Sequence, residues 1–464
     1  MLHNEKMITI VGGGFAGVEA AWAIAGRGGR VRLVEMRPVR ETGAHKTEFL
    51  AELVCSNSFK SMLSTSPAGQ LKAEMVGLGS IVIPTAEAHS VPGGEALCVD
   101  RDAFAGAITA KIESHPFIEV VREEFTPDMA NRMLGDGDIL IVCTGPLTSR
   151  PLGKWLAGLT GRKHLYFYDA VSPTVEASTL DRSVVFAQSR YGKGGDDYLN
   201  CPFEKESYLA FVHELVHAER ALPHGVAAED ETLEKIKYFA GCTPIEAIAE
   251  GGERSLAFGN FKPVGLTDPR TGRRPYAALQ LRPENREKTL YSLVACQNRL
   301  KWGEQKRIFR MVPGLENAEF VRFGVIHRNT YIDSPQVLAP WLEMRDYPGL
   351  FIAGQITGVE GYVESAAMGI YAGIAALRKL RNLDQVVPPR PSAYGSLISH
   401  LQDTTPREFA PMNINWGLFP DPEPPVRDKQ VKRDWKLSEA RRGFEQWAPE
   451  LNRFEVMIPN GSTG

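Results

Sequence analysis

The stretch Ile8-Thr9-Ile10-Val11-Gly12-Gly13-Gly14-Phe15-Ala16-Gly17 decides the fold. A β-branched run leads into three glycines, and a helical pattern at 20–25 follows them. In a dinucleotide-binding βαβ unit, one glycine permits a tight turn, one lets the backbone approach a pyrophosphate, and one lets the helix pack on the strand. Gly12, Gly14 and Gly17 stand at these positions, so the helix N-terminus should face phosphate groups.

An acidic residue completes this motif. The second strand-like run, Val31 to Val34, ends at Glu35. A carboxylate there accepts hydrogen bonds from ribose hydroxyls and repels a 2′-phosphate, so FAD or NAD fits better than NADP. We predict that the cofactor is bound by Gly12, Gly13, Gly14, Phe15, Ala16, Gly17, Glu35, Met36 and Arg37.

Later glycines favour a flavin over a nicotinamide as the resident cofactor. The apolar run 138–143 ends in Thr144-Gly145, and a second run, 349–353, ends in Gly354-Gln355. Gly361 precedes a small-residue helical pattern at 365–373, whose N-terminus can face a pyrophosphate or a ring. We therefore add Gly145, Gly354, Gln355 and Gly361 to the predicted FAD-binding residues.

Length and composition set the fold class. With 464 residues, 43% of them hydrophobic, the chain can bury more than one core. We predict an α/β protein: a Rossmann-like FAD-binding domain of the two-dinucleotide-binding flavoprotein type with a smaller inserted α/β domain. Residues 1–190 and 325–464 should form the discontinuous FAD-binding domain, with a C-terminal tail from about 386, and residues 191–324 the insertion. We expect a cytoplasmic protein without membrane contact, because no apolar run could span a bilayer and no signal-peptide pattern precedes the first strand.

Six cysteines lie far apart without a C-x-x-C pair: Cys55, Cys98, Cys143, Cys201, Cys242 and Cys296. This spacing argues against a metal site and against a disulfide framework, so we expect reduced thiols. Cys98, Cys143 and Cys296 lie in apolar patterns typical of core residues. Cys201, which precedes Pro202, stays ambiguous.

Two cysteines are candidates for catalysis. After Cys242, Thr243 is predicted to cap a helix, with Pro244 as its first residue and Glu246 completing a Thr-x-x-Glu capping box. The Cys242 sulfur would then lie at the positive end of a helix, which favours the reactive thiolate. Cys55 stands where a strand-like run gives way to a polar Ser-Asn-Ser segment. Taken alone, each cysteine is as often structural as catalytic.

A local basic strip raises the question of RNA binding. The net charge of −3 gives the whole molecule no electrostatic reason to bind nucleic acid. From Lys262 to Arg310, however, there are twelve Lys or Arg and four Asp or Glu, with Tyr276, Tyr291 and Trp302 interleaved. Such a strip suits phosphates and unstacked bases. A solvated charged face explains the same pattern equally well.

Motifs from Ile10 to Gly417 carry a resemblance. They are Ile10–Trp22, Val34–Pro38, Ala51–Ser58, Tyr198–Pro202, Gly241–Glu246, Lys262–Leu266, Gln280–Arg282, His327–Thr330, Gly354–Tyr362 and Phe409–Gly417. Across nearly its whole length the chain resembles the bacterial folate- and FAD-dependent tRNA uracil-C5 methyltransferases. The resemblance implies a product, ribothymidine (m5U54) in the tRNA T loop. It also implies that 5,10-methylenetetrahydrofolate supplies the carbon, that reduced FAD supplies the reducing equivalent, and that NADH or NADPH restores the flavin.

The resemblance also assigns roles to residues. Uracil C5 becomes nucleophilic after a thiolate adds to C6, and its proton must then be removed. We predict Cys242 as the nucleophile and Cys55 as the flavin-side partner, although these two roles can be exchanged. Tyr362 would stack on the pterin, and Arg282, His327 and Arg328 would line the cleft. His327 and Arg328 fit a structural turn equally well.

Several alternatives share parts of this pattern. The same chemistry on a ribosomal RNA uridine would use the same thiols and folate. The tRNA wobble-uridine flavoproteins share the fold but carry a long C-terminal helical region, for which we expect no room here. A small-molecule FAD oxidoreductase or disulfide reductase, or an RNA-binding flavoprotein without catalysis, would leave the cysteines without these roles. No second dinucleotide motif is present, so NAD(P)H should bind at the flavin, and no protein partner is evident.

Overall fold

A five-stranded parallel sheet, in the order β16-β7-β1-β2-β6, carries the N-terminal glycine turn. Its strands are β1 (Ile8–Val11), β2 (Val31–Glu35), β6 (Ile118–Arg122), β7 (Leu140–Val142) and β16 (Leu350–Ile352), and every pairing is parallel. The carboxyl ends of parallel strands meet at one edge of the sheet. The glycine turn, Glu35, Gly145 and Gly354 are therefore brought together there from distant parts of the chain.

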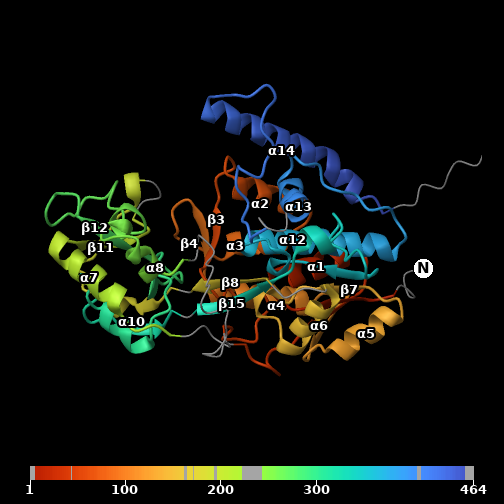
Figure 1. The fold of residues 1–464 in the computed structure, drawn as a ribbon, viewed down its shortest axis with the longest axis horizontal. Coiled ribbons are helices and arrows are strands. Elements are labelled where there is room, and N and C mark those ends of the chain that lie inside the picture. Colours follow the sequence, from red (N-terminus) through yellow and green to blue (C-terminus); the bar gives the residue numbers. More distant parts are fainter. Residues whose placement is uncertain are drawn as a thin grey trace, which may run out of the picture.

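The computed structural model describes residues 6–42, 44–160, 172–192, 196–221, 243–324, 331–404 and 409–454, and the backbone alone of 165–170 and 326–330. These residues form two lobes (Figure 1). The larger lobe is built on the five-stranded sheet, and the smaller lobe on a separate six-stranded sheet. No helix among these residues has both the length and the apolar character needed to cross a bilayer.

Two helices of the larger lobe pack closely because of glycines. Helix α1 (Phe15–Ala25) begins at the glycine turn, and α12 (Tyr362–Leu380) is buried along most of its length. A Cβ atom on Gly369 would lie 2.1 Å from the Ala16 carbonyl oxygen, and one on Gly373 would lie 2.7 Å from that of Ala20. Both distances are far below van der Waals contact, so only glycine lets these helices approach so closely.

Further helices and a small antiparallel sheet complete the larger lobe. The sheet has the order β3-β5-β4, with β3 (Ser58–Ser61), β4 (Ser90–Val91) and β5 (Ala96–Val99). The helices are α2 (Pro67–Gly77), α3 (Val82–Ala88), α4 (Arg101–Glu113), α5 (Pro127–Gly135), α6 (Arg150–Thr160), α11 (Ser334–Val337), α13 (Ala393–Asp403) and α14 (Lys429–Leu451), with 3-10 turns η1 (Gly145–Leu147) and η6 (Gln355–Thr357).

The segment after 386, which we expected to be a tail, packs on this lobe. Helix α14 lies across its top in Figure 1, and its Trp447 and Leu451 are buried in the main core. The buried Glu74 of α2 accepts hydrogen bonds from the backbone nitrogens of Ala393 and Tyr394, at 2.8 and 3.1 Å. Glu74 thereby binds buried N–H groups at the start of α13 that have no partner within the helix. The C-terminal segment is part of the larger lobe's core.

The smaller lobe contains a six-stranded sheet in the order β10-β11-β12-β13-β9-β14, all antiparallel. Its strands are β9 (Thr174–Glu176), β10 (Phe186–Ala187), β11 (Leu199–Phe203), β12 (Ala277–Pro283), β13 (Leu290–Leu293) and β14 (Phe320–Arg322). Its helices are α7 (Lys205–His217), α8 (Ile245–Glu250), α9 (Ser255–Phe258) and α10 (Trp302–Phe309), with η2 (Ala177–Thr179) and η3 (Arg190–Gly192). Because β9 and β10 precede residue 191, we propose that this domain begins near residue 172.

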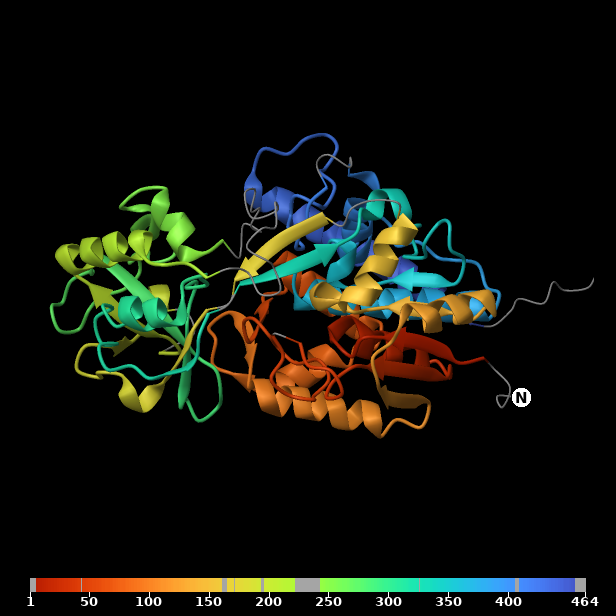
Figure 2. The ribbon, with the colours of Figure 1, turned by 60° about the horizontal axis from the view of Figure 1, so that its bottom comes forward.

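Two kinds of contact join the lobes. β8 (Leu165–Ala170) and β15 (Ile326–Tyr331) pair antiparallel between them, as Figure 2 shows in yellow and teal. Side chains add direct bridges: Asn57 Nδ2 donates to the Pro283 carbonyl at 3.1 Å, and Tyr198 Oη donates to that of Gly93 at 2.9 Å. The loop before β3 therefore lies against the end of β12.

Candidate active site

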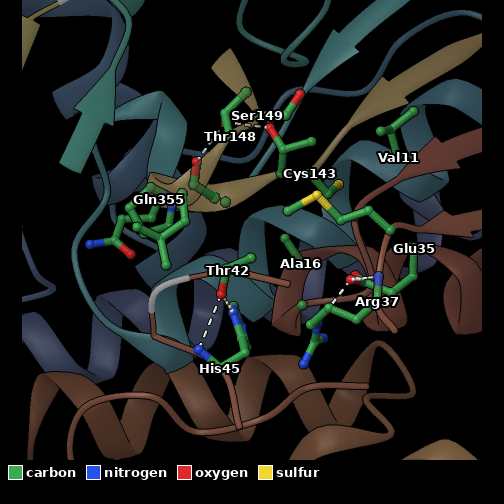
Figure 3. A pocket seen from close by; sticks show the side chains of 18 of the residues that line it. Val11, Ala16, Glu35, Arg37, Thr42, His45, Cys143, Thr148, Ser149 and Gln355 are labelled. Atoms are coloured by element: carbon green, nitrogen blue, oxygen red, sulfur yellow. Dashed lines mark hydrogen bonds and ion pairs between the residues drawn. The ribbon is translucent and has the colours of Figure 1, made fainter. Parts of the chain in front are cut away.

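An elongated pocket opens at the carboxyl edge of the parallel sheet, with about 1020 Å³ of empty space including the part open to solvent. Most of the predicted FAD-binding residues line it: Gly12, Gly14, Phe15, Ala16, Glu35, Met36, Arg37, Gly145, Gly354 and Gln355. Tyr362, predicted to stack on the pterin, lines it as well. Figure 3 shows Glu35 and Arg37 at one side of this pocket and Gln355 at the other, with Ala16 between them.

The glycines of the turn differ in what surrounds them. A Cβ atom on Gly12, whose φ is 102°, would lie 2.6 Å from the Cys143 carbonyl oxygen. One on Gly17 would lie 1.8 Å from the Gly12 carbonyl oxygen, and one on Gly13 would lie 2.4 Å from Leu50. A Cβ atom on Gly14 would meet nothing within 4 Å. Gly12, Gly13 and Gly17 are therefore required by packing, whereas Gly14 faces open space.

The N-terminus of α1 is suited to bind an anion. Its N-cap residue is Gly14, no side chain caps it, and its first turn contains no acidic residue. The first N–H groups of a helix lack partners within the helix and carry a partial positive charge. These groups lie beside the pocket, where a dinucleotide pyrophosphate could accept their hydrogen bonds.

Glu35 is held in its ionised form at the end of β2. Its Oε2 accepts a hydrogen bond from the Gly13 nitrogen at 2.7 Å, and its Oε1 accepts from the nitrogen and Nε of Arg37 at 3.0 and 2.9 Å. Burial alone would raise its pKa, but the Arg37 charge and these hydrogen bonds outweigh burial and hold the pKa below its ordinary value. Because Oε2 accepts only one bond, it retains a lone pair for a ribose hydroxyl.

A loop after β2 forms another wall of the pocket. Arg37 Nη1 donates to the Thr47 carbonyl and to Glu52 Oε2, both at 3.0 Å, which ties this loop to β2. His45 lies within it, with its Nδ1 2.6 Å from Thr42 Oγ1. Burial and the Arg37 charge lower the pKa of His45 to about 4, so this imidazole is neutral at pH 7. Sequence reasoning missed all three residues: no motif marks Thr42 or His45, and Glu52 lies in the motif Ala51–Ser58 but was given no role.

Tyr362 connects the pocket to the cysteine loop, residues 51–57 just before β3. Its ring lies 4.7 Å from that of Phe15, centroid to centroid, at the start of α12. Its Oη accepts a hydrogen bond from the backbone nitrogen of Cys55 at 2.7 Å. Cys55 is half-buried and forms no disulfide. The predicted flavin-side cysteine and the predicted pterin-stacking tyrosine are thus direct neighbours.

Two arginines from opposite lobes contact the same loop. Arg101, the first residue of α4, donates to the Leu53 and Cys55 carbonyls at 2.5 and 2.6 Å and forms an ion pair with Glu284, just beyond β12. Arg322, the last residue of β14, places Nη2 3.5 Å from the Cys55 carbonyl. Burial would raise the pKa of Glu284, but Arg101, Arg322 and Arg282 outweigh it and hold the pKa at about 2. Sequence reasoning missed Arg101 and Arg322.

Comparison with known proteins places the chain in a family. The family model described as "Glucose inhibited division protein A" matches residues 7–384. A protein of Desulforudis audaxviator named "Methylenetetrahydrofolate--tRNA-(uracil-5-)-methyltransferase TrmFO" is 50% identical over 96% of this chain and 98% of that one. A protein of the same name from Geobacter sulfurreducens is 52% identical over 95% of this chain and 97% of that one. The chain belongs to the TrmFO family.

A solved structure agrees with this assignment at the level of the fold. Aquifex aeolicus GidA, in its form II crystal, superimposes with a TM-score of 0.64 at 15% identity, over 96% of this chain and 74% of that one. The predicted fold class, a Rossmann-like FAD-binding α/β protein, is confirmed for this TrmFO family member.

Some predicted site residues do not line the pocket of this TrmFO chain. Gly361 has a φ of 112° and precedes α12, where a Cβ atom would lie 2.5 Å from Glu364 Oε2. Arg282 lies on β12, close enough to Cys98 and Tyr198 to influence the pKa of both, and its Nε is buried without a hydrogen-bond partner in the described part of the chain. Cys242 lies outside the described residues, as do the side chains of His327 and Arg328.

The predicted capping box after Cys242 is wrong. Helix α8 begins at Ile245, its N-cap residue is Pro244 with a ψ of 140°, and no side chain caps it. The Pro244 carbonyl accepts the first bonds of the helix, from the nitrogens of Ala247 and Ile248. Glu246 turns inward instead, where its Oε1 accepts from the Arg299 nitrogen at 3.1 Å. Burial raises the pKa of this carboxyl group.

The remaining cysteines belong to the cores. Cys98, Cys143 and Cys296 are buried, which confirms their prediction as core residues, and the ambiguous Cys201 is buried in β11. Burial raises the pKa of all four thiols.

The basic strip is only partly exposed, and some of its charges are paired. Tyr291 is buried, whereas Trp302 is 61% exposed. Several of its cations form ion pairs with carboxylates, as Arg307 does with Glu214 and Glu304.

Proposed function

We propose that this chain transfers the one-carbon unit of methylenetetrahydrofolate to C5 of a uridine in tRNA and reduces it to a methyl group. The carrying observation is the contact between Tyr362 and Cys55, which places a cysteine loop against a dinucleotide pocket. This arrangement occurs in a chain that is half identical to proteins named as tRNA uracil methyltransferases. It favours this activity over small-molecule flavin oxidation, which needs no such cysteine.

The pocket fits FAD. The open space above Gly14 and the uncapped start of α1 suit a pyrophosphate, and the Glu35 carboxylate suits a ribose. Gly145, Gly354 and Gln355 would hold the rest of the cofactor on the far side. When bound, FAD supplies the reducing equivalents that convert a methylene into a methyl group. We propose NADH or NADPH as the external reductant.

The two candidate cysteines are proposed to have different roles in the reaction at the uracil ring. A thiolate that adds to C6 makes C5 nucleophilic, and we assign this addition to Cys242, which stands three residues before the start of α8 in the sequence. A base must then remove the C5 proton after the new bond has formed. Cys55 is proposed as this base, because Tyr362 holds its backbone beside the pocket.

The folate site is proposed at the same end of the pocket. The Tyr362 ring, packed on Phe15, offers a flat surface for the pterin. Arg282 and the β15 residues His327 and Arg328 are proposed as neighbours of the folate. Within tRNA, the proposed target is the T-loop uridine at position 54.

One assay tests this function. The purified protein is incubated with methylenetetrahydrofolate labelled in its methylene carbon, NADH or NADPH, and an unmodified tRNA transcript, and the label is located by nuclease mapping. We expect label in the T loop. Parallel reactions contain a ribosomal RNA transcript in place of tRNA, or labelled S-adenosylmethionine in place of labelled folate. Label in ribosomal RNA alone would make that RNA the substrate, and label from S-adenosylmethionine would contradict folate as the carbon source. Absence of label from any RNA would refute the proposal.

A further inference from the structure

The carbonyl oxygen of Cys55 is approached by guanidinium groups of both lobes. Arg101 reaches it from α4 in the larger lobe at 2.6 Å, and Arg322 reaches it from β14 in the smaller lobe at 3.5 Å. Both arginines are part-buried, and a charge on Cys55 acts on the pKa of each, so the sulfur lies within their electrostatic range. The cysteine loop is therefore a junction where charges of both lobes meet.

Among the described residues, three arginines and one glutamate gather at this junction. Glu284 is within range of Arg101, Arg322 and Arg282, and of these three only Arg101 is paired with it directly. Arg322 makes weaker contacts, with the Cys55 carbonyl and with Thr174 Oγ1 at 3.4 Å. A part-buried guanidinium is stabilised by a nearby anion, and among the described residues no carboxylate forms an ion pair with Arg322. An ionised Cys55 would provide that anion.

We infer that Arg322 is a positioning residue that holds the Cys55 sulfur as a thiolate, and that Glu284 limits this effect by pairing with Arg101. Among the described residues, the titratable and charged groups that face the loop are Arg101 from α4, Arg322 from β14 and Tyr362 from α12, with Glu284 and Arg282 behind Arg101. Since Arg322 and Glu284 both belong to the smaller lobe, the charge on Cys55 depends on the docking of the two lobes. The inference rests on the proposed function only for the use of this thiolate as a base.

The pH dependence of Cys55 alkylation tests the inference directly. The flavin-loaded protein is treated with iodoacetamide between pH 5 and 9, and the tryptic peptide 47–60, in which Cys55 is the only cysteine, is quantified by mass spectrometry. The thiolate is the reactive form, so the midpoint of the rate reports its ionisation. This readout needs neither tRNA nor folate. It can therefore fail while wild-type methylation succeeds, and the reverse also holds.

Removal of the two charges should shift this midpoint in opposite directions. Arg322→Gln should raise it by about one pH unit, with about tenfold slower alkylation below the midpoint. Arg322→Lys keeps the charge and should restore a midpoint near that of the wild type. Glu284→Gln should lower the midpoint, because it leaves the positive charge of Arg101 unbalanced.

A matched control is Arg310→Gln in the smaller lobe. Arg310 pairs with Glu319 and has no contact with the cysteine loop among the described residues. The midpoint of Cys55 alkylation in this variant should therefore equal that of the wild type. If Arg322 and Glu284 had a purely structural role, the midpoint of Cys55 alkylation would shift in the same direction in Arg322→Gln and in Glu284→Gln. That result, or an unchanged midpoint in Arg322→Gln, would overturn the inference.

Discussion

The phenolic oxygen of Tyr362 accepts a hydrogen bond from the backbone nitrogen of Cys55, with 2.7 Å between the two atoms. Tyr362 belongs to α12, which packs on helix α1 beside the pocket, whereas Cys55 belongs to a loop that touches the smaller lobe. This hydrogen bond thus joins the pocket, the cysteine and the interface between the lobes. A change at Tyr362 should affect catalysis without removing the cofactor site.

Tyr362→Phe should lower the rate of tRNA methylation about three- to tenfold and leave bound FAD in place. The variant keeps the ring that packs on Phe15 but loses the acceptor for the Cys55 nitrogen, and one such hydrogen bond is worth about 0.5–1.5 kcal/mol. Single-turnover methylation and the flavin absorbance of the purified protein give the two readouts. Tyr394→Phe is the control, because the buried Tyr394 Oη has no hydrogen-bond partner among the described residues. Equal losses in both variants would contradict a specific role for Tyr362.

Alanine at two glycines of the turn should have different effects. Gly17→Ala should prevent proper folding, because its Cβ would lie 1.8 Å from the Gly12 carbonyl oxygen. Gly14→Ala should fold normally, since its φ is −75° and its Cβ meets no protein atom, but it should lose FAD because the methyl group takes up pocket space. Thermal melting of the FAD-free proteins and flavin titration separate the two effects. A Gly14→Ala protein that retains yellow flavin would show that the pyrophosphate lies elsewhere.

Most of the predicted cofactor residues line one pocket, and their common location follows from local rules. A glycine that follows a parallel strand lies at the carboxyl edge of the sheet. The meeting of Gly12, Gly145 and Gly354 at this edge can therefore be predicted without knowing any contact between distant residues. The start of α8 was misplaced by one residue. Proline is compatible with both the N-cap and the first helical position. The start at Ile245 goes with the hydrogen bond from the Arg299 nitrogen to Glu246, which holds this side chain in the interior and away from the helix N-terminus.

The arginines at Cys55 could not be predicted in this way. Arg101 begins a helix and Arg322 ends a short strand, and neither position carries a motif. They meet only because the lobes dock through contacts such as that between Asn57 and Pro283. Docking of two lobes depends on surface complementarity over many residues, which no short sequence pattern encodes.

Gly369→Ala should destabilise the larger lobe, whereas Gly158→Ala should stabilise it. At Gly369 the new Cβ would lie 2.1 Å from the Ala16 carbonyl oxygen, so α1 and α12 must separate at a cost of about 1–3 kcal/mol or more. At Gly158, in α6, nothing lies within 4 Å, and alanine should gain about 0.5–1 kcal/mol from its helix propensity. Urea denaturation of both variants gives the comparison. A stable Gly369→Ala protein would mean that these helices are not in close contact.

Glu74 should make a contribution to stability that falls as the pH rises from 5 to 7. Burial raises the pKa of Glu74 to about 7 in the folded protein, from an ordinary value of 4.5. Between these values the folded state holds a proton that the unfolded state has lost, so the free energy of unfolding decreases by up to about 1.4 kcal/mol per pH unit. Below 4.5 both states are protonated, and above 7 both are ionised, so the slope from this group disappears.

Glu74→Gln should therefore flatten the dependence of unfolding free energy on pH. The nitrogens of Ala393 and Tyr394 donate to different oxygens of Glu74, so the amide oxygen can still accept one of these two bonds, while the titration is removed. Urea denaturation at pH 5, 6, 7 and 8 should give a smaller slope for the variant than for the wild type. Glu119→Gln, an exposed residue of β6, serves as the control and should keep the wild-type slope. Parallel curves for wild type and Glu74→Gln would show that Glu74 stays ionised in the folded protein throughout this range.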